Sequence, residues 1–135
     1  MSKQAIAIIY APPGAGKTKW LDNVCKFKDL VLDTDDQPFT GKKALLAKGK
    51  RIVLTNLPLL LVNNEFNITI AIIYSRKEWN RRVSFKCHDF SEMWYDDSVY
   101  FSNRAQFKLH PGDSDMSACN DRLDTILHDI VSTNM

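Results

Sequence analysis

The chain has 135 residues, of which 44% are hydrophobic and 25% are charged, a composition typical of a globular domain. This length suits one domain, and we predict a single domain that spans residues 1–135. The formal net charge is only +2, so the composition does not indicate nucleic acid or an anionic membrane as the main partner.

The sequence also argues against membrane insertion and secretion. No stretch reaches the roughly 18 consecutive apolar residues of a membrane helix, and the N-terminus lacks the pattern of a signal peptide. Cys25, Cys87 and Cys119 are widely spaced, which favours a reducing compartment over a disulfide framework. With His88 and His110 included, their spacing still matches no usual zinc site. We therefore predict a cytoplasmic protein without a zinc cluster.

The first half of the chain alternates short apolar runs with helical patterns. Residues 4–10 form a continuous apolar run rich in β-branched side chains, which is typical of a strand buried on both faces. After a loop rich in proline and glycine, residues 17–27 carry apolar side chains at helical spacing. Further strands are predicted at 30–32 and 51–54, and a short helix is predicted between them at 41–48, where a glycine ends it.

The second half continues the alternation. The apolar run at 59–62 is too short to be assigned to a helix or a strand. A fourth strand is predicted at 67–74, a helix from 75, and a mostly helical segment at 85–107. Residues 107–109 are predicted as a last short strand. An amphipathic helix follows, with Ser117 as its expected N-cap. This order predicts an α/β fold with three layers, a parallel sheet with flanking helices.

The most specific motif is the loop at 11–18, Ala-Pro-Pro-Gly-Ala-Gly-Lys-Thr, which matches the Walker A pattern of P-loop proteins except for alanine at its first position. It lies between an apolar strand and an amphipathic helix, the context in which such a loop binds phosphate. We expect it to hold ATP, and the expected contact residues are Pro13, Gly14, Ala15, Gly16, Lys17 and Thr18.

The residues of this loop have different expected roles in binding phosphate. Glycine-rich turns aim backbone N–H groups inward and so form an anion nest. Lys17 is expected to reach the β- and γ-phosphates, and Thr18 is expected to place its hydroxyl on Mg²⁺. We also expect Lys17 to lie in an open loop, so that replacing it barely changes stability without nucleotide.

Two carboxylates follow the second predicted strand. Asp33 and Asp35 come 16 and 18 residues after Lys17, and the carboxyl ends of neighbouring parallel strands share one edge of a sheet. One carboxylate is expected to hold Mg²⁺ through water, and the other to accept a proton from an acceptor hydroxyl or to orient it. A solvated turn is the alternative interpretation, because Asp favours turns.

The segment 6–35 resembles the start of the small P-loop kinases. Its loop resembles that of nucleoside monophosphate kinases, and Asp33-Thr34-Asp35 resembles the Asp-x-Asp of shikimate and gluconate kinases. The resemblance implies the kinase-like P-loop NTPase fold. It also implies that Asp33 helps to hold Mg²⁺ and that Asp35 binds the acceptor alcohol.

A weaker likeness extends into the second half of the chain. The segments 70–75 and 78–82 are similar to the fourth strand and the lid-entering helix of these kinases, where arginines clamp the transferring phosphoryl group. The resemblance therefore implies catalytic roles for Arg81 and Arg82, although a solvated helix face is equally compatible with the residues alone. The aromatic residues that follow suit either the core or stacking on a base, and they are Trp94, Tyr95 and Tyr100.

We therefore predict an ATP- and Mg²⁺-dependent phosphotransferase whose acceptor is a nucleoside monophosphate or a small alcohol. Two alternatives stay open. Thr55-Asn56 resembles the polar sensor of AAA-type ATPases, which is compatible with a motor, helicase or packaging NTPase. The other alternative is a nucleotide-binding structural protein without catalysis. The sequence does not decide the oligomeric state.

Overall fold

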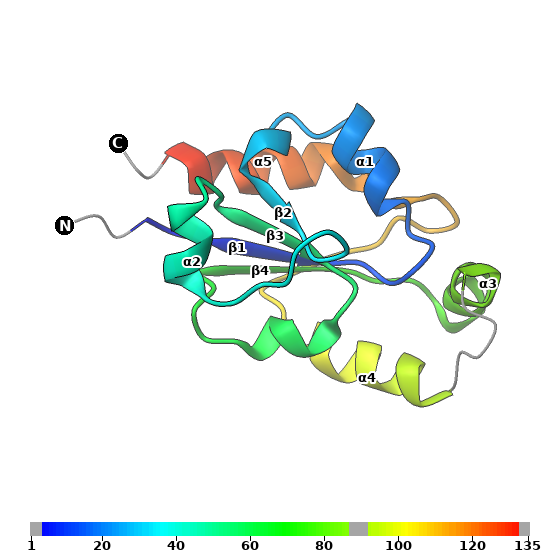
Figure 1. Cartoon of the computed structure of the whole chain (residues 1–135). Coiled ribbons are helices and arrows are strands. Elements are labelled where there is room, and N and C mark those ends of the chain that lie inside the picture. Colours follow the sequence, from blue (N-terminus) through cyan, green and yellow to red (C-terminus); the bar gives the residue numbers. More distant parts are fainter. Residues whose placement is uncertain (1–3, 87–91, 133–135) are drawn as a thin grey trace.

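The computed structural model describes residues 4–86 and 92–132, and for 84–86 and 92–93 it describes the backbone alone. Within these residues, five parallel strands form one sheet in the order β2-β3-β1-β4-β5 (Figure 1). Its strands are β1 (Ala7–Tyr10), β2 (Val31–Asp33), β3 (Ile52–Thr55), β4 (Ile68–Ile72) and β5 (Phe107–Leu109). Helices cover both faces of this sheet, so the predicted α/β architecture is confirmed.

The helical segments fill the connections between the strands. The α-helices are α1 (Lys17–Asn23), α2 (Lys42–Ala47), α3 (Arg76–Lys86), α4 (Glu92–Ser102) and α5 (Asn120–Ser132). The 3-10 helices are η1 (Lys28–Leu30), η2 (Pro58–Val62) and η3 (Met116–Cys119). The apolar run at 59–62, which periodicity could not type, thus belongs to a 3-10 helix.

Two predicted helix boundaries were wrong. The first helix ends at Asn23 rather than at residue 27, because the φ of Val24, −124°, lies outside the helical range. Ser117 is not the cap of the final helix. The side chain of Asp115 instead accepts a hydrogen bond from the Ser117 N–H at 3.0 Å and caps η3, and α5 begins only at Asn120. The segment 87–91, inside the predicted helical stretch 85–107, lies outside the described residues.

Alternation along the strands divides the core between the two faces of the sheet. Ala7 and Ile9 pack in a cluster with α1 and α5, whereas Ile8 and Tyr10 pack in a second cluster with α2 and η2. Figure 1 shows α1 and α5 above the sheet and α2 and α4 below it. Both faces are therefore covered, which explains why the first strand reads as a continuous apolar run.

The parallel register brings the carboxyl ends of the central strands to one edge. Tyr10 at the end of β1 is level with Thr55 at the end of β3, and Asp33 of β2 is level with Leu54. The loop that follows Tyr10 and the polar residues that follow β2 and β3 consequently meet at this edge. Within the described part of the chain, no helix is long and apolar enough to cross a membrane.

Candidate functional site

The loop between β1 and α1 is a tight turn held to the sheet. It starts with the Ala11 N–H, which donates to the Thr55 carbonyl at 3.0 Å, and it turns through a bond from the Ala15 N–H to the Pro12 carbonyl at 3.1 Å. Gly14 and Gly16 have φ values of +84° and +83°. Because residues with a Cβ rarely adopt these angles, the glycines of the motif are needed for this path.

The glycines are also needed for space. A Cβ at Gly14 would lie 2.4 Å from the carbonyl oxygen of Arg82, and a Cβ at Gly16 would lie 2.9 Å from the Cβ of Asp115. The outside of the loop is therefore packed against α3 and against the segment before η3. A further bond, from the Met116 N–H to the Ala15 carbonyl at 2.8 Å, ties the loop to η3.

Lys17 is enclosed by this loop. Its side chain is buried, with the residue only 8% exposed, and the Nζ donates to the carbonyl oxygens of Ala11 and Pro12, each at 3.2 Å. The expectation that Lys17 lies in an open loop is therefore wrong. The loop curls around its side chain, and carbonyl oxygens orient the ammonium group.

A cleft of about 400 Å³ opens in front of the loop. Its size lies within the usual range of about 300–1,000 Å³ for small-ligand sites. Its walls combine loop residues with the ends of β2 and β3, and the lining residues are Pro13, Gly14, Gly16, Lys17, Thr18, Lys19, Asp35 and Asn56. The fold thus brings Asp35 together with most of the predicted phosphate-contacting residues. Ala15 is buried rather than part of this lining.

Backbone amides of the cleft add donors. Among the described residues, no protein acceptor is found for the N–H groups of Gly14, Gly16 and Thr18. Unpaired backbone amides in a turn of this kind contribute positive potential to a concave anion site. Together with the ammonium of Lys17, they are a donor set that fits a polyphosphate.

The two carboxylates occupy different environments at the end of β2. Asp33 accepts a hydrogen bond from the Asp35 N–H at 3.0 Å, which closes the turn. Burial raises the pKa of Asp33, and the neighbouring Asp35 and Asp36 raise it further, while the Asp35 N–H and the Lys17 charge act in the opposite direction. Asp33 therefore lies within electrostatic reach of Lys17, and Asp35 is exposed toward the cleft.

The oxygen groups near the loop suit a magnesium ion that also binds water and phosphate. Within the described residues, they do not form a closed site in which protein ligands alone surround the metal. Thr18 is exposed and lines the cleft, and the Asp33 and Asp35 carboxylates lie at the carboxyl end of β2, which β3 separates from β1. Mg²⁺ typically binds through one or two carboxylates, water and substrate phosphates. In the described part of the chain, no group of three or more His, Cys, Asp or Glu side chains gathers as a metal cluster.

Arg81 and Arg82 lie on α3 and both pair with Glu78, in the case of Arg82 at 3.1 Å, but their other contacts differ. Arg82 is 13% exposed and donates to the Gly14 carbonyl at 3.1 Å and to the Asp113 carbonyl at 2.8 Å, while its guanidinium lies 4.8 Å from the centre of the Tyr74 ring. Arg81 is 63% exposed and pairs with Glu78. Arg82 thus contacts the loop from behind, and Arg81 lies in solvent next to it.

Polar contacts at the end of β3 present Asn56 to the cleft. The Thr34 hydroxyl donates to the Thr55 Oγ1 at 3.0 Å, and the Leu57 N–H donates to the same oxygen at 3.0 Å. These bonds hold the chain on both sides of Asn56. The sequence marked Thr55-Asn56 only as a sensor-like pair, and its position beside Lys17 comes from the strand pairing.

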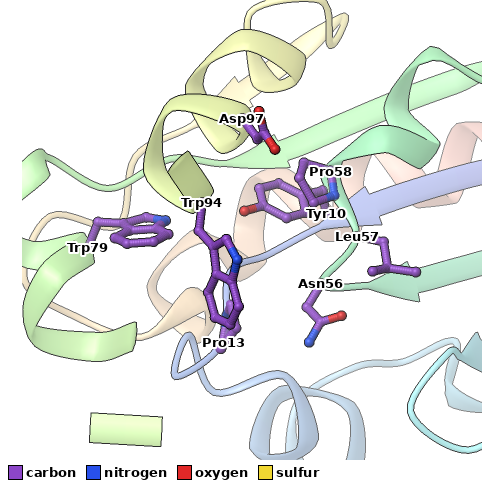
Figure 2. Close-up of a pocket in the computed structure, with 8 residues that line it drawn as sticks. All are labelled: Tyr10, Pro13, Asn56, Leu57, Pro58, Trp79, Trp94 and Asp97. Atoms are coloured by element: carbon purple, nitrogen blue, oxygen red, sulfur yellow. The ribbon is translucent and has the colours of Figure 1, made fainter. Parts of the chain in front are cut away.

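A second cavity, of about 350 Å³, adjoins the cleft and was not predicted (Figure 2). We call it the tryptophan cavity, and its lining residues are Tyr10, Pro13, Asn56, Leu57, Pro58, Trp79, Trp94 and Asp97. Pro13 and Asn56 line both spaces. Of these residues, the sequence had singled out Trp94 as suited to stacking or to the core, but nothing in it linked α4 to the end of β1.

Comparisons with known proteins support the fold alone. No protein-family model matches the chain, and no curated protein matches it. Among solved structures, it is similar to the crystal structure of an uncharacterized protein from Eubacterium ventriosum ATCC 27560, with a TM-score of 0.51 and 11% sequence identity. The similarity covers 94% of this chain and 99% of that chain. The shared feature is therefore the overall α/β architecture.

Proposed function

We propose that the protein is an ATP-dependent phosphotransferase that transfers the γ-phosphoryl group of ATP to a small acceptor. The observation that supports this most is the enclosed ammonium of Lys17, which lies in a cleft shared with the Thr18 hydroxyl and the Asp35 carboxylate. A buried cation surrounded by backbone donors suits a ligand with several negative charges.

Binding of the triphosphate rests on the loop. The N–H groups of Gly14, Gly16 and Thr18 donate to phosphate oxygens, and Lys17 supplies the charge toward the β- and γ-phosphates. The Thr18 hydroxyl would hold Mg²⁺, with Asp33 acting through water. When bound, the ion neutralises phosphate charge during transfer.

Asp35 is the proposed base for the acceptor. In the reaction, the acceptor oxygen forms a bond to the γ-phosphorus, the bond from that phosphorus to the β,γ-bridging oxygen breaks, and ADP leaves. The acceptor proton passes to the Asp35 carboxylate. Arg81, whose guanidinium is largely exposed, is proposed to turn toward the charge that develops on the transferring group.

A phosphotransferase is favoured over a simple NTPase because the cleft continues into the tryptophan cavity. Hydrolysis needs room only for a water molecule, whereas a second cavity of about 350 Å³ at the mouth of the cleft has space for an organic acceptor. The direct test incubates the protein with Mg·ATP alone and then with a panel of alcohols, nucleosides and nucleoside monophosphates. We expect phosphorylated acceptor, whereas phosphate release that is independent of any acceptor would contradict the proposal.

Nucleotide binding is tested by replacing Lys17. Ligand binding stabilises a protein by RT ln(1 + [L]/Kd), about 2.7 kcal/mol at a hundredfold excess over Kd. We expect saturating Mg·ATP to raise the Tm of the parent and to leave that of Lys17→Ala unchanged. Because Lys17 is buried, the shift must be measured within each variant, from its own ligand-free Tm. Lys43→Ala, an exposed position on α2, is the matched control and should respond like the parent. Equal shifts in the parent and Lys17→Ala would show that the loop does not bind the triphosphate.

A further inference from the structure

The tryptophan cavity begins where the phosphate cleft ends. Because Pro13 and Asn56 line both spaces, a ligand in the cavity lies next to the position proposed for the γ-phosphate. Figure 2 shows Trp94 reaching from α4 toward Pro13, with Tyr10 and Asn56 on one side of it and Trp79 on the other. The cavity is thus assembled from the ends of β1 and β3 and from two helices that come much later in the chain.

Fixed aromatic rings form part of the wall. Tyr10 and Trp79 are buried, the Tyr10 hydroxyl is hydrogen-bonded to the Ser98 Oγ at 2.7 Å, and Trp79 packs edge-on against Tyr95 at 5.4 Å between ring centroids. Trp94 differs, because it is 43% exposed. A large ring that stays in solvent beside two buried rings offers a stacking surface for another planar group.

The charge of the cavity disfavours anions. Among the described lining residues there is no Lys or Arg, and the charged side chain is the carboxylate of Asp97. Burial raises the pKa of Tyr10 to about 12, with its hydrogen bonds acting in the opposite direction, so its hydroxyl stays neutral at physiological pH. A phosphate or carboxylate group placed here would meet a like charge without a counterion. The Asp97 carboxylate and the Asn56 amide suit a ring that carries N–H donors and acceptors.

We infer that the tryptophan cavity binds an uncharged, planar heterocycle, and that the phosphoryl acceptor is an unphosphorylated ring-bearing alcohol of the nucleoside type rather than a nucleoside monophosphate. The second half of this inference rests on the proposed function, whereas binding of the ring does not. With the ring against Trp94, the shared wall at Pro13 and Asn56 directs the hydroxyl toward the cleft that Asp35 lines. Its oxygen then bonds to the γ-phosphorus, ADP departs, and the proton passes to Asp35.

The test measures binding directly by calorimetry. The ligands are the five common nucleosides and their 5′-monophosphates, each titrated with and without saturating Mg²⁺ and β,γ-imido-ATP. We expect at least one nucleoside to bind both with and without the analogue and, when the analogue occupies the phosphate cleft, to bind at least tenfold more tightly than its monophosphate. Trp94→Ala should weaken nucleoside binding by about tenfold or more, since stacking of a base on an aromatic ring is lost. Trp94→Phe keeps a ring and should retain most of the affinity.

Tyr100→Ala is the matched control, because Tyr100 is an exposed aromatic residue on the same helix and packs against Phe101 outside the cavity. It should bind nucleosides like the parent. Asp97→Lys supplies the missing countercharge and should shift the preference toward monophosphates. Thermal melts of each variant verify that it is folded.

Several results would overturn the inference. They are monophosphates binding as tightly as nucleosides in the presence of the analogue, no binding by any nucleoside, or unchanged affinity in Trp94→Ala. Loss of nucleoside binding in the presence of the imido analogue would assign the cavity to the base of the triphosphate instead. Failure of the proposed function looks different: nucleosides would bind in a manner that depends on Trp94, but Mg·ATP would neither bind nor yield a phosphorylated nucleoside.

Discussion

At the scale of single residues, the site contains ionisable groups for which burial disfavours the charged form. Lys17 is buried and its ammonium donates to the carbonyl oxygens of Ala11 and Pro12, and Asp33 lies where burial favours its protonated form. Burying a charge costs free energy unless partners compensate it. Sites that bind charged ligands commonly carry such a cost, because the ligand or its metal ion supplies the compensation.

Asp33 is expected to lower stability at neutral pH. Its pKa is raised above the ordinary 3.8 in the folded protein, so the folded state binds the proton more tightly than the unfolded chain does. The stability linked to this proton is present below pH 3.8 and is lost as the pH rises through the folded pKa. Asp33→Asn removes this cost and keeps an oxygen that can accept the Asp35 N–H. We expect its Tm without nucleotide to exceed that of the parent at pH 7, and the difference to disappear near about pH 3.

Thermal melts between these two pH values test the effect. Asp35→Asn is the control, since Asp35 is exposed and replacing it should change the Tm little. A Tm of Asp33→Asn below that of the parent at pH 7 would contradict the expected linkage.

Asp35 is expected to act in turnover rather than in binding of the triphosphate. Its carboxylate lines the cleft but is not part of the loop that surrounds Lys17. Asp35→Asn should leave the affinity for Mg·ATP near that of the parent and lower acceptor phosphorylation by about 10²–10⁴-fold, the usual contribution of a general base. Calorimetry and product analysis on the same preparation check both parts. An equal loss of ATP affinity and turnover would place Asp35 in triphosphate binding instead.

At the scale of elements, α3 supports the phosphate loop through backbone contacts. Arg82 links three segments, because its guanidinium contacts the carbonyl of Gly14, the carbonyl of Asp113 and the ring of Tyr74. The carbonyl of Arg82 itself leaves no space for a Cβ at Gly14. The path of the loop therefore depends on a helix that begins about sixty residues later.

Replacing Arg82 should destabilise this junction. Arg82→Ala removes charge-assisted hydrogen bonds to two carbonyls, and a loss of roughly 1.5–3 kcal/mol in the free energy of unfolding is expected. Arg81→Ala is matched in chemistry and adjacent in sequence, but Arg81 is exposed and its pair with Glu78 should contribute much less to stability. Urea denaturation measures both. If Arg81 acts on the transferring phosphoryl group, its replacement lowers kcat at unchanged stability. Equal stability of Arg82→Ala and the parent would show that the junction does not hold the loop.

At the scale of the whole molecule, one sheet joins two hydrophobic clusters. Ile9 belongs to the cluster with α1 and α5, and Ile8, its neighbour on β1, belongs to the cluster with α2 and η2. Loss of either cluster exposes one face of the same short strands. The two halves of the core should therefore unfold together.

Core substitutions on opposite faces test this coupling. Leu127→Ala, on α5, and Leu45→Ala, on α2, each remove a fully buried side chain and should cost about 2–5 kcal/mol. Circular dichroism and tryptophan fluorescence should report one coincident urea transition in both variants, with the parent's m-value. Leu59→Ala, at an exposed position on η2, should have little effect. Separate transitions in either variant would show that the faces unfold independently.

The sequence by itself determined the order of the elements and the position of the loop, because both depend on local patterns. The apolar run before residue 11, the glycines at 14 and 16, and the short strand at 107–109 can each be recognised without knowledge of their neighbours. Only the tertiary structure decided which residues and elements these segments contact. It placed β1 between β3 and β4, enclosed Lys17, and set Trp94 of α4 beside Tyr10 of β1. The pairing of β1 with β3 joins residues 45 positions apart, its pairing with β4 joins residues 61 positions apart, and the bond between Tyr10 and Ser98 joins residues 88 positions apart, so a local pattern carries no signal for these contacts.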